Sequence, residues 1–191
     1  MAHDSAYHFK GDVLSRSQLI ERTVVECIIA SVAKIPDNER TWGMAFELKH
    51  SSGVIQIGRL LAQKRGLNPE LAGIACVLHD IYVNETGDDT SHAARGAAIA
   101  EQMLRDTKKF TDTEIALITQ AIKNHSDKHI VSDSPYDELV KDADAFECCL
   151  YENGKAAYLA CKTVETCRIY FARVQKIRAE LGLPNDSQWD I

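Results

Sequence analysis

The fold is decided first by residues 48–66, which read LKHSSGVIQIGRLLAQKRG. Apolar side chains recur in this stretch at the spacing of one face of an α-helix, namely Leu48, Val54, Ile57 and Leu61. Gly66 follows them, as a glycine often follows a helix C-terminus. We therefore predict a long amphipathic helix from about residue 41 to residue 65.

Helix signals continue on both sides of this stretch. Asn68 followed by Pro69 is typical of a helix cap and a first helical residue, and Thr111 with Glu114 forms a capping box. Polar segments at residues 84–91 and 124–134 are expected to be loops, and no segment alternates as a β-strand does. We predict an all-α, single-domain helical bundle in which the first and last helices pack around a central group. Its expected helices span residues 17–34, 41–65, 69–79, 92–106, 111–124, 135–151 and 155–181.

The composition is that of an ordinary globular protein, with 45% apolar and 26% charged residues in a chain of 191. No internal repeat or linker rich in proline and glycine divides it, so we expect one helical domain over residues 1–191. The net charge of −6 argues against binding of extended nucleic acid, which needs a basic surface. A small anionic substrate would need a local positive centre.

The sequence also bears on localisation. No apolar run is long enough to cross a bilayer, and residues 1–11 lack the apolar segment of a secretory signal. Six cysteines lie in apolar stretches without a C-x-x-C pair: Cys27, Cys76, Cys148, Cys149, Cys161 and Cys167. Free thiols in a reducing compartment explain this pattern better than a disulfide framework. We therefore expect a cytoplasmic protein with no membrane partner.

Three histidines are candidates for chemistry. His50 lies on the apolar stripe of its predicted helix, and His79 and His125 continue such stripes at the ends of two others. A single histidine on an apolar stripe is more often a satisfied core residue than a ligand. Three of them, with Asp80 directly after His79, favour a ligand cluster. An unpaired carboxylate beside an apolar core costs several kcal/mol, and a divalent cation is a suitable partner for Asp and His together.

A second acidic site lies in the predicted helix over residues 135–151. Asp142 and Asp144 each lie toward one flank of its apolar stripe, and Asp142 is slightly the closer. Periodicity therefore does not choose between them. The competing interpretation is that both are solvated acids, one of them paired with Lys141.

The order of His50, the pair His79-Asp80 and a later aspartate resembles the H…HD…D signature of the HD-domain superfamily of metal-dependent phosphohydrolases. The resemblance covers about residues 47–150. Three further segments resemble motifs of that superfamily: residues 72–81, the apolar approach to the His-Asp pair; residues 91–97, with a His-x-x-x-Gly-Ala pattern; and residues 122–125, with a further histidine.

The resemblance implies a ligand set. The metal-binding aspartate of the family usually follows alanine in an Ala-Asp pair, which selects Asp144 over Asp142. The implied ligands are His50, His79, Asp80, His92, His125 and Asp144. In a two-metal version, the first two histidines and Asp144 hold one ion, the last two histidines hold the other, and Asp80 bridges. In a one-metal version, His92 and His125 face the substrate phosphate instead.

The resemblance also implies an activity. We expect a phosphomonoesterase or phosphodiesterase that attacks a nucleotide or another small phosphate ester with metal-activated water, and Asp80 is its catalytic residue. The cofactor would be one or two divalent ions of Fe, Mn, Ni, Co or Zn. Arg95, Lys123 and Lys128 flank the ligands and could bind phosphate oxygens, although exposed, solvated charges are the commoner case.

Other interpretations remain open at this point. Tyr82 and Val83 stand where many members continue with Gly-Lys, which argues against a cyclic-dinucleotide phosphodiesterase. A di-iron oxygenase on the same scaffold and a non-catalytic, nucleotide-sensing module are the alternatives. Tyr158, Tyr170 and Phe171 belong either to the core or to a self-association face, which leaves a homo-oligomer open.

Overall fold

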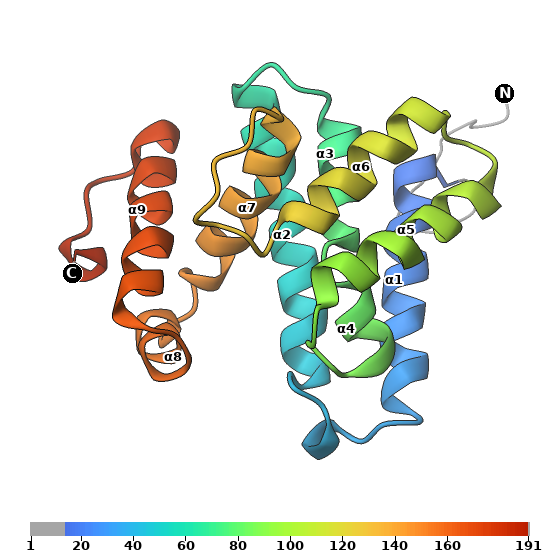
Figure 1. The fold of residues 1–191 in the computed structure, drawn as a ribbon, viewed down its shortest axis with the longest axis horizontal. Helices are drawn as coiled ribbons and strands as arrows, with labels where there is room; N and C mark the ends of the chain where they lie inside the picture. The colour runs from blue at the N-terminus through green and yellow to red at the C-terminus, as the bar shows by residue number, and fades with distance from the viewer. Residues whose placement is uncertain (1–13, 191) are drawn as a thin grey trace, which may run out of the picture.

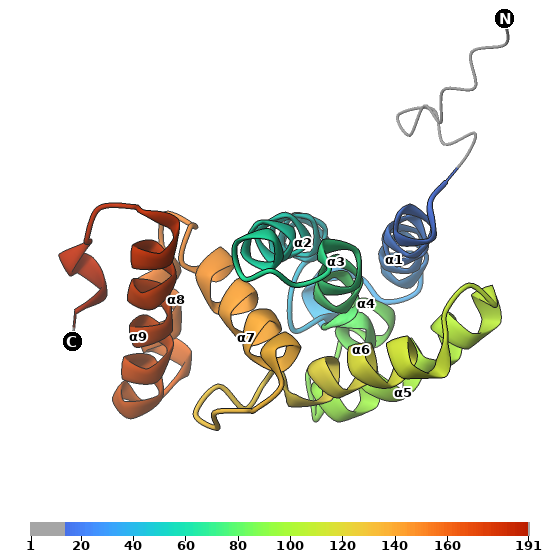
Figure 2. The same cartoon turned by 90° about the horizontal axis from the view of Figure 1, so that it is seen from above.

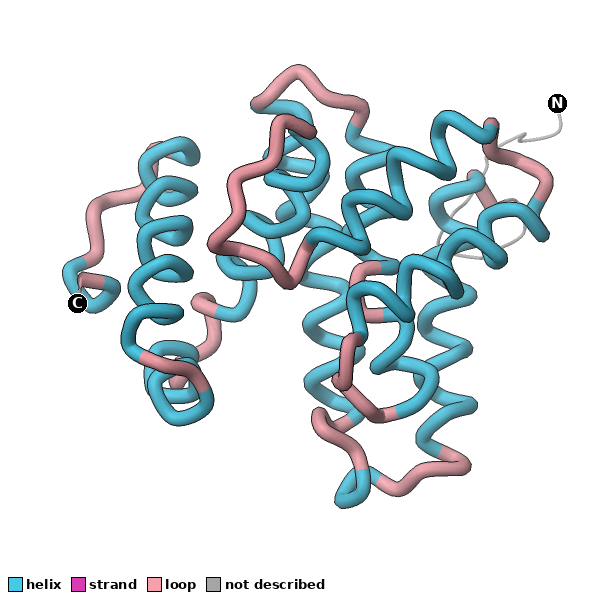
Figure 3. Tube along the Cα trace, viewed as in Figure 1, coloured by secondary structure: helices cyan, strands magenta, loops and turns pink. Residues whose placement is uncertain are grey.

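The computed structural model describes residues 14–190, and within that range every regular element is a helix (Figure 1, Figure 3). The prediction of an all-α fold is therefore confirmed. The α-helices are α1 (Arg16–Val32), α2 (Met44–Lys64), α3 (Pro69–Leu78), α4 (Ile81–Thr86), α5 (His92–Thr107), α6 (Asp112–Asn124), α7 (Pro135–Cys148), α8 (Gly154–Cys161) and α9 (Val164–Leu181). Two short 3-10 helices, η1 (Asp37–Glu39) and η2 (Ser187–Trp189), accompany them.

The central group consists of α2, α3 and α7, which pack against one another (Figure 1, Figure 2). On one side α1 packs against α3 and α4, and on the opposite side α9 packs against α7. The pair α5 and α6 closes the remaining face through α4 and α3. Tyr158, Tyr170 and Phe171 are buried within the chain, so these aromatic side chains serve the core.

The close approach of α2 and α3 depends on a glycine. A Cβ added at Gly58 would lie only 2.4 Å from Sγ of the buried Cys76. Since no real side chain fits at that distance, the helices could not pack so closely with any larger residue at position 58. This packing holds His50 of α2 opposite His79, the residue that follows α3.

The start of α2 is fixed by a buried ion pair. Nη2 of Arg40 lies 2.7 Å from Oε2 of Glu47, and both side chains are fully buried. The same guanidinium donates to the carbonyl oxygens of Val83 and Asn84, which ties the beginning of α2 to α4. Because η1 and the turn after it occupy residues 37–43, α2 begins at Met44, later than the predicted residue 41.

Three predicted segments differ from the structure. Part of the expected loop at 84–91 belongs to α4, a helix too short to show periodicity, which ends at Gly87 with a φ of 70°. The single helix expected over 155–181 is two helices, because the side chain of Thr163 accepts a hydrogen bond from the Thr166 N–H and caps a new start. The expected helix to residue 151 ends at Cys148. The two capping motifs, at Asn68 and Thr111, are confirmed.

Within residues 14–190, none of the helices combines the length and the apolar character needed to cross a membrane. The expectation about residues 1–11 concerns a segment outside the described residues.

The α2–α3 contact yields a stability prediction. Gly58→Ala should lower the free energy of unfolding, because overpacking costs about 1–3 kcal/mol and exceeds the gain of about 1 kcal/mol in helix propensity. In a Cys76→Ala background the sulfur is gone, so the same substitution should become neutral or stabilising. Urea denaturation of all four proteins of this double-mutant cycle measures the change. An equal loss in both backgrounds would show that the contact does not limit the helix spacing.

Candidate metal centre

Four imidazoles and two carboxylates converge where α2, α3, α5, α6 and α7 meet. His50 and Asp144 come from within α2 and α7, whereas the others stand at helix ends: His79 caps α3, Asp80 precedes α4, His92 begins α5 and His125 caps α6. The structure thus brings together all six side chains that the family resemblance implied as ligands.

The Nδ1 atoms of the imidazoles are bound on the outer side of the cluster. His79 donates to the Cys76 carbonyl at 2.6 Å, and His92 and His125 donate to the carbonyl oxygens three residues before them, at 2.9 and 2.7 Å. A carbonyl oxygen only accepts, so each Nδ1 carries the proton. In the neutral ring the lone pair is then on Nε2, which points inward.

The outer nitrogen of His50 is also hydrogen-bonded, but its partner is a side-chain carboxylate instead of a backbone carbonyl. Its Nδ1 lies 2.6 Å from Oε2 of Glu147, a buried carboxylate of α7. Sequence reasoning missed Glu147, although it follows Asp144 by three residues and so shares its side of the helix. Gly53, one turn after His50, leaves room for it, because a Cβ there would lie 2.5 Å from Oε1 of Glu147.

The inward nitrogens form two pairs. Nε2 of His50 is 3.2 Å from Nε2 of His79, and Nε2 of His92 is 3.1 Å from Nε2 of His125. Two lone pairs at this distance repel each other unless a metal ion or a proton lies between them. With bonds of about 2.1 Å to one metal ion, neighbouring ligand atoms lie about 3.0–3.4 Å apart, so both spacings fit metal coordination.

The carboxylate of Asp80 lies between the two imidazole pairs. Its Oδ2 is 3.1 Å from Nε2 of His79 and 3.6 Å from Nε2 of His50. Its Oδ1 is 3.5 Å from Nε2 of His92 and 3.4 Å from Nε2 of His125. Oδ1 is buried and has no hydrogen-bond partner among the described residues, which is costly for a carboxylate oxygen without a cation. One oxygen for each pair fits a bridging ligand.

The local field favours positive charge. Burial disfavours a charged imidazole, yet Asp80 and Asp144 together raise the pKa of His79 to about 9. Burial opposes ionisation of Asp80, but His79 and His125 hold its pKa well below the usual range. Burial lowers the pKa of His125, which keeps that ring neutral and able to ligate. Asp80 is therefore ionised and His125 neutral, while the carboxylates beside His79 stabilise positive charge at that position.

Asp144 and Asp142 face different sides of α7, and Asp144 faces the cluster. Oδ1 of Asp144 faces the cluster, 3.6 Å from Nε2 of His50, and its Oδ2 accepts from Nζ of the buried Lys128 at 2.5 Å. Although burial opposes ionisation, Lys128 and the imidazoles lower the pKa of Asp144. Lys128 is therefore not the solvated cation that is common for lysine; its charge is committed to Asp144.

Asp142 is fully buried and paired on the other side of α7. Its Oδ1 and Oδ2 lie 2.7 Å from guanidinium nitrogens of Arg173 and Arg65, respectively. The interpretation of Asp142 as a solvated flank acid is wrong, because burial with two arginines makes it part of an internal ion-pair network. Lys141 is bonded instead to Glu138 and to the Ile130 carbonyl.

The other two predicted phosphate-binding residues, Arg95 and Lys123, make no hydrogen bond or ion pair with the six cluster residues as the structure describes them. Arg95 is exposed on α5, bonded to the Tyr82 hydroxyl and 3.7 Å from Asp88. Lys123 is exposed on α6. Of the three candidates, Lys128 alone contacts a residue of the cluster within the described range, and it does so through Asp144.

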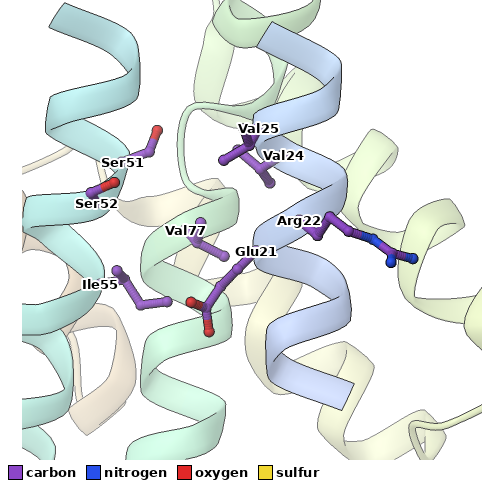
Figure 4. Close-up of a pocket in the computed structure, with 8 residues that line it drawn as sticks. All are labelled: Glu21, Arg22, Val24, Val25, Ser51, Ser52, Ile55 and Val77. Carbon is purple, nitrogen blue, oxygen red and sulfur yellow. The ribbon is translucent and has the colours of Figure 1, made fainter. Parts of the chain in front are cut away.

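Two cavities lie near this region. The cavity in Figure 4, about 310 Å³, is lined by residues of α1, α2 and α3, including Val25, Ile55 and Val77, and by none of the six cluster residues. A second cavity of about 270 Å³ is lined in part by Ser126 and Lys128. Ser126 Oγ is 3.3 Å from Nε2 of His92, so the second cavity borders the cluster.

Comparison with known proteins identifies a family. A family model described as HD domain matches residues 48–148, more than half of the chain. The matched range includes the six cluster residues and Glu147. No curated protein and no solved structure matches the chain.

The two aspartates of α7 offer a matched pair of variants. Asp144→Asn should weaken binding of a divalent ion by more than about tenfold, because it removes a charged group facing His50. Asp142→Asn should keep metal affinity but destabilise the fold by about 2 kcal/mol, because Arg65 and Arg173 each lose one of two carboxylate partners. Calorimetric titration with Mn²⁺ and urea denaturation measure the two effects. Loss of metal binding in a folded Asp142→Asn protein would reverse this assignment.

Proposed function

The chain belongs to the HD-domain family, and from this premise we propose that it is a metal-dependent phosphohydrolase acting on a nucleotide or another small phosphate ester. The proposal is carried by one observation. The Asp80 carboxylate lies between two pairs of inward-facing imidazole nitrogens and directs one oxygen toward each pair.

We propose two divalent ions with Asp80 as their shared ligand. His50, His79 and Asp144 would complete the first set, and His92 with His125 would complete the second. The support lies in the distances, since each pair of neighbouring donor atoms named above is separated by 3.1–3.6 Å. Nitrogen and oxygen ligands of this kind suit Fe, Mn, Ni, Co and Zn.

Such ions, when bound, lower the pKa of a coordinated water and offset the charge of a phosphate group. The chain's own residues prepare the site for that chemistry. Glu147 orients His50 through Nδ1, and three backbone carbonyls do the same for the other imidazoles. Lys128 holds one oxygen of Asp144, so that the other remains directed at His50. These contacts fix the donor atoms before substrate arrives.

The substrate would approach from the side where the cluster is most open. The side chains of His92 and Asp144 are 20% and 13% exposed, while His79 and His125 are 1% and 2% exposed. A small phosphate ester can reach such an opening, and both monoesters and diesters are compatible with it. We further propose a cytoplasmic location, supported by buried free thiols such as Cys76 and Cys167.

Metal content and phosphate release test the proposal together. Purified wild type should contain two transition-metal ions per chain and release phosphate from a panel of esters, and chelation should abolish release until metal is restored. The double variant His79→Ala with Asp80→Ala should lose both ions and all turnover. His92→Ala should retain about one ion. Elemental analysis and a phosphate assay provide the measurements.

The exposed His129 supplies the control. His129→Ala should keep wild-type metal content, because its exposed side chain belongs to none of the groups that could hold a metal ion. Full metal retention with unchanged turnover in the His79→Ala, Asp80→Ala protein would end the proposal. Turnover that requires oxygen would also contradict hydrolysis.

A further inference from the structure

An aromatic stripe leads along α2 to the candidate metal centre. Trp42, Phe46 and His50 follow one another at intervals of four residues, which places them on one side of the helix and its entry turn. The rings of Trp42 and Phe46 lie 5.7 Å apart in an edge-to-face arrangement. The rings of Phe46 and His50 are stacked at 5.1 Å with an angle of 11°.

These two aromatic rings are placed unlike those of the core. Trp42 and Phe46 are half-buried and lie outside the set of side chains that form the hydrophobic core, whereas Trp189 and Phe171 are buried within it. Their neighbours include two imidazoles of the site and, for Phe46, the ring of Tyr151 at 5.5 Å. Phe46 covers His50, and Trp42 lies 6.3 Å from the ring of His92, the most exposed histidine of the cluster.

Hydrogen bonds of the neighbouring backbone fix the position of Trp42. The Thr41 N–H donates to the Gly87 carbonyl at 2.8 Å, and the neighbouring Arg40 is locked in its buried ion pair with Glu47. The Met44 N–H donates to Oδ1 of Asp37 at 2.7 Å, which fixes the other side of Trp42. Because the backbone is fixed on both sides of Trp42, the aromatic stripe loses little conformational freedom when a flat ligand binds to it.

We propose that Trp42 and Phe46 form a stacking surface for the base of a nucleotide whose phosphate lies at the metal centre. This inference rests on the proposed hydrolase function and narrows its substrate class to nucleotides. Half-exposed aromatic rings lack the charge and hydrogen-bond donors that bind phosphate, but they bind the face of a planar base. Since every base has such a face, this surface accepts different bases with little discrimination.

Fluorescence of Trp42 tests the stacking directly. The chain has two tryptophans, Trp42 and Trp189, so Trp189→Phe leaves Trp42 as the reporter. Metal-loaded Trp189→Phe protein is titrated with adenosine 5′-monophosphate and, as a probe without a base, with ribose 5-phosphate. We expect saturable quenching by the first and no quenching by the second. Equal quenching by both probes overturns the inference.

Kinetics provide the second readout. Trp42→Leu should lower kcat/KM for adenosine 5′-monophosphate by about tenfold, in the range measured for base–aromatic stacking, and change that for ribose 5-phosphate by less than about twofold. Trp42→Phe should restore most of the loss, and Trp189→Phe should alter neither substrate. Equal loss for both substrates in Trp42→Leu overturns stacking and indicates a structural role.

The inference and the proposed function can fail separately. Quenching by the nucleotide in a wild-type protein that hydrolyses no phosphate ester supports the stacking surface and refutes the hydrolase. Hydrolysis of both esters without quenching of Trp42 supports the hydrolase and refutes the stacking surface.

Discussion

The hydrogen bond on the outer nitrogen of each imidazole is the constraint on which the cluster depends. Carbonyl groups near a helix C-terminus lack intrahelical partners, so His79 and His125, which cap α3 and α6, find an acceptor three residues earlier in their own helix. His50 lies inside α2, where the carbonyl groups are already used. It therefore needs a side-chain acceptor from another helix, which Glu147 supplies. Four inward lone pairs follow from these four bonds.

The scaffold around the cluster separates charges that the sequence places side by side. Asp142 and Asp144 are two residues apart, so they point to nearly opposite sides of α7. Asp142 pairs with Arg65 and Arg173, which also bind Glu180 and Glu138, while Asp144 faces His50 and Lys128. One helix thus serves the internal ion-pair network on one face and the candidate metal centre on the other.

The sequence predicted those features that depend on local periodicity. Helices with apolar stripes and capping motifs were found, but the six residues of α4 are too few to show a period, and the break at Thr163 interrupts a stripe that continues beyond it. His50, His79 and His125 were found because they continue apolar stripes, whereas His92 was named only through the family resemblance. Periodicity could not choose Asp144, and Glu147 was missed because its role depends on a contact between residues 97 positions apart. Such contacts are set by helix packing and cannot be read from local spacing.

The net charge of the candidate metal centre decides whether it attracts or repels a phosphate group. Asp80, Asp144 and Glu147 bring three negative charges to the cluster and Lys128 one positive charge, while the imidazoles are neutral as ligands. Without cations this cluster repels phosphate, as does the chain as a whole with its net charge of −6. Two divalent ions, bound as proposed, would turn the local charge to about +2 and attract phosphate. Phosphate binding then depends on metal loading. The proposed stacking surface of Trp42 and Phe46 is uncharged, so its contribution to binding does not depend on charge. A substrate carrying both groups gains from both terms, which is the physical reason to favour nucleotides over simpler esters.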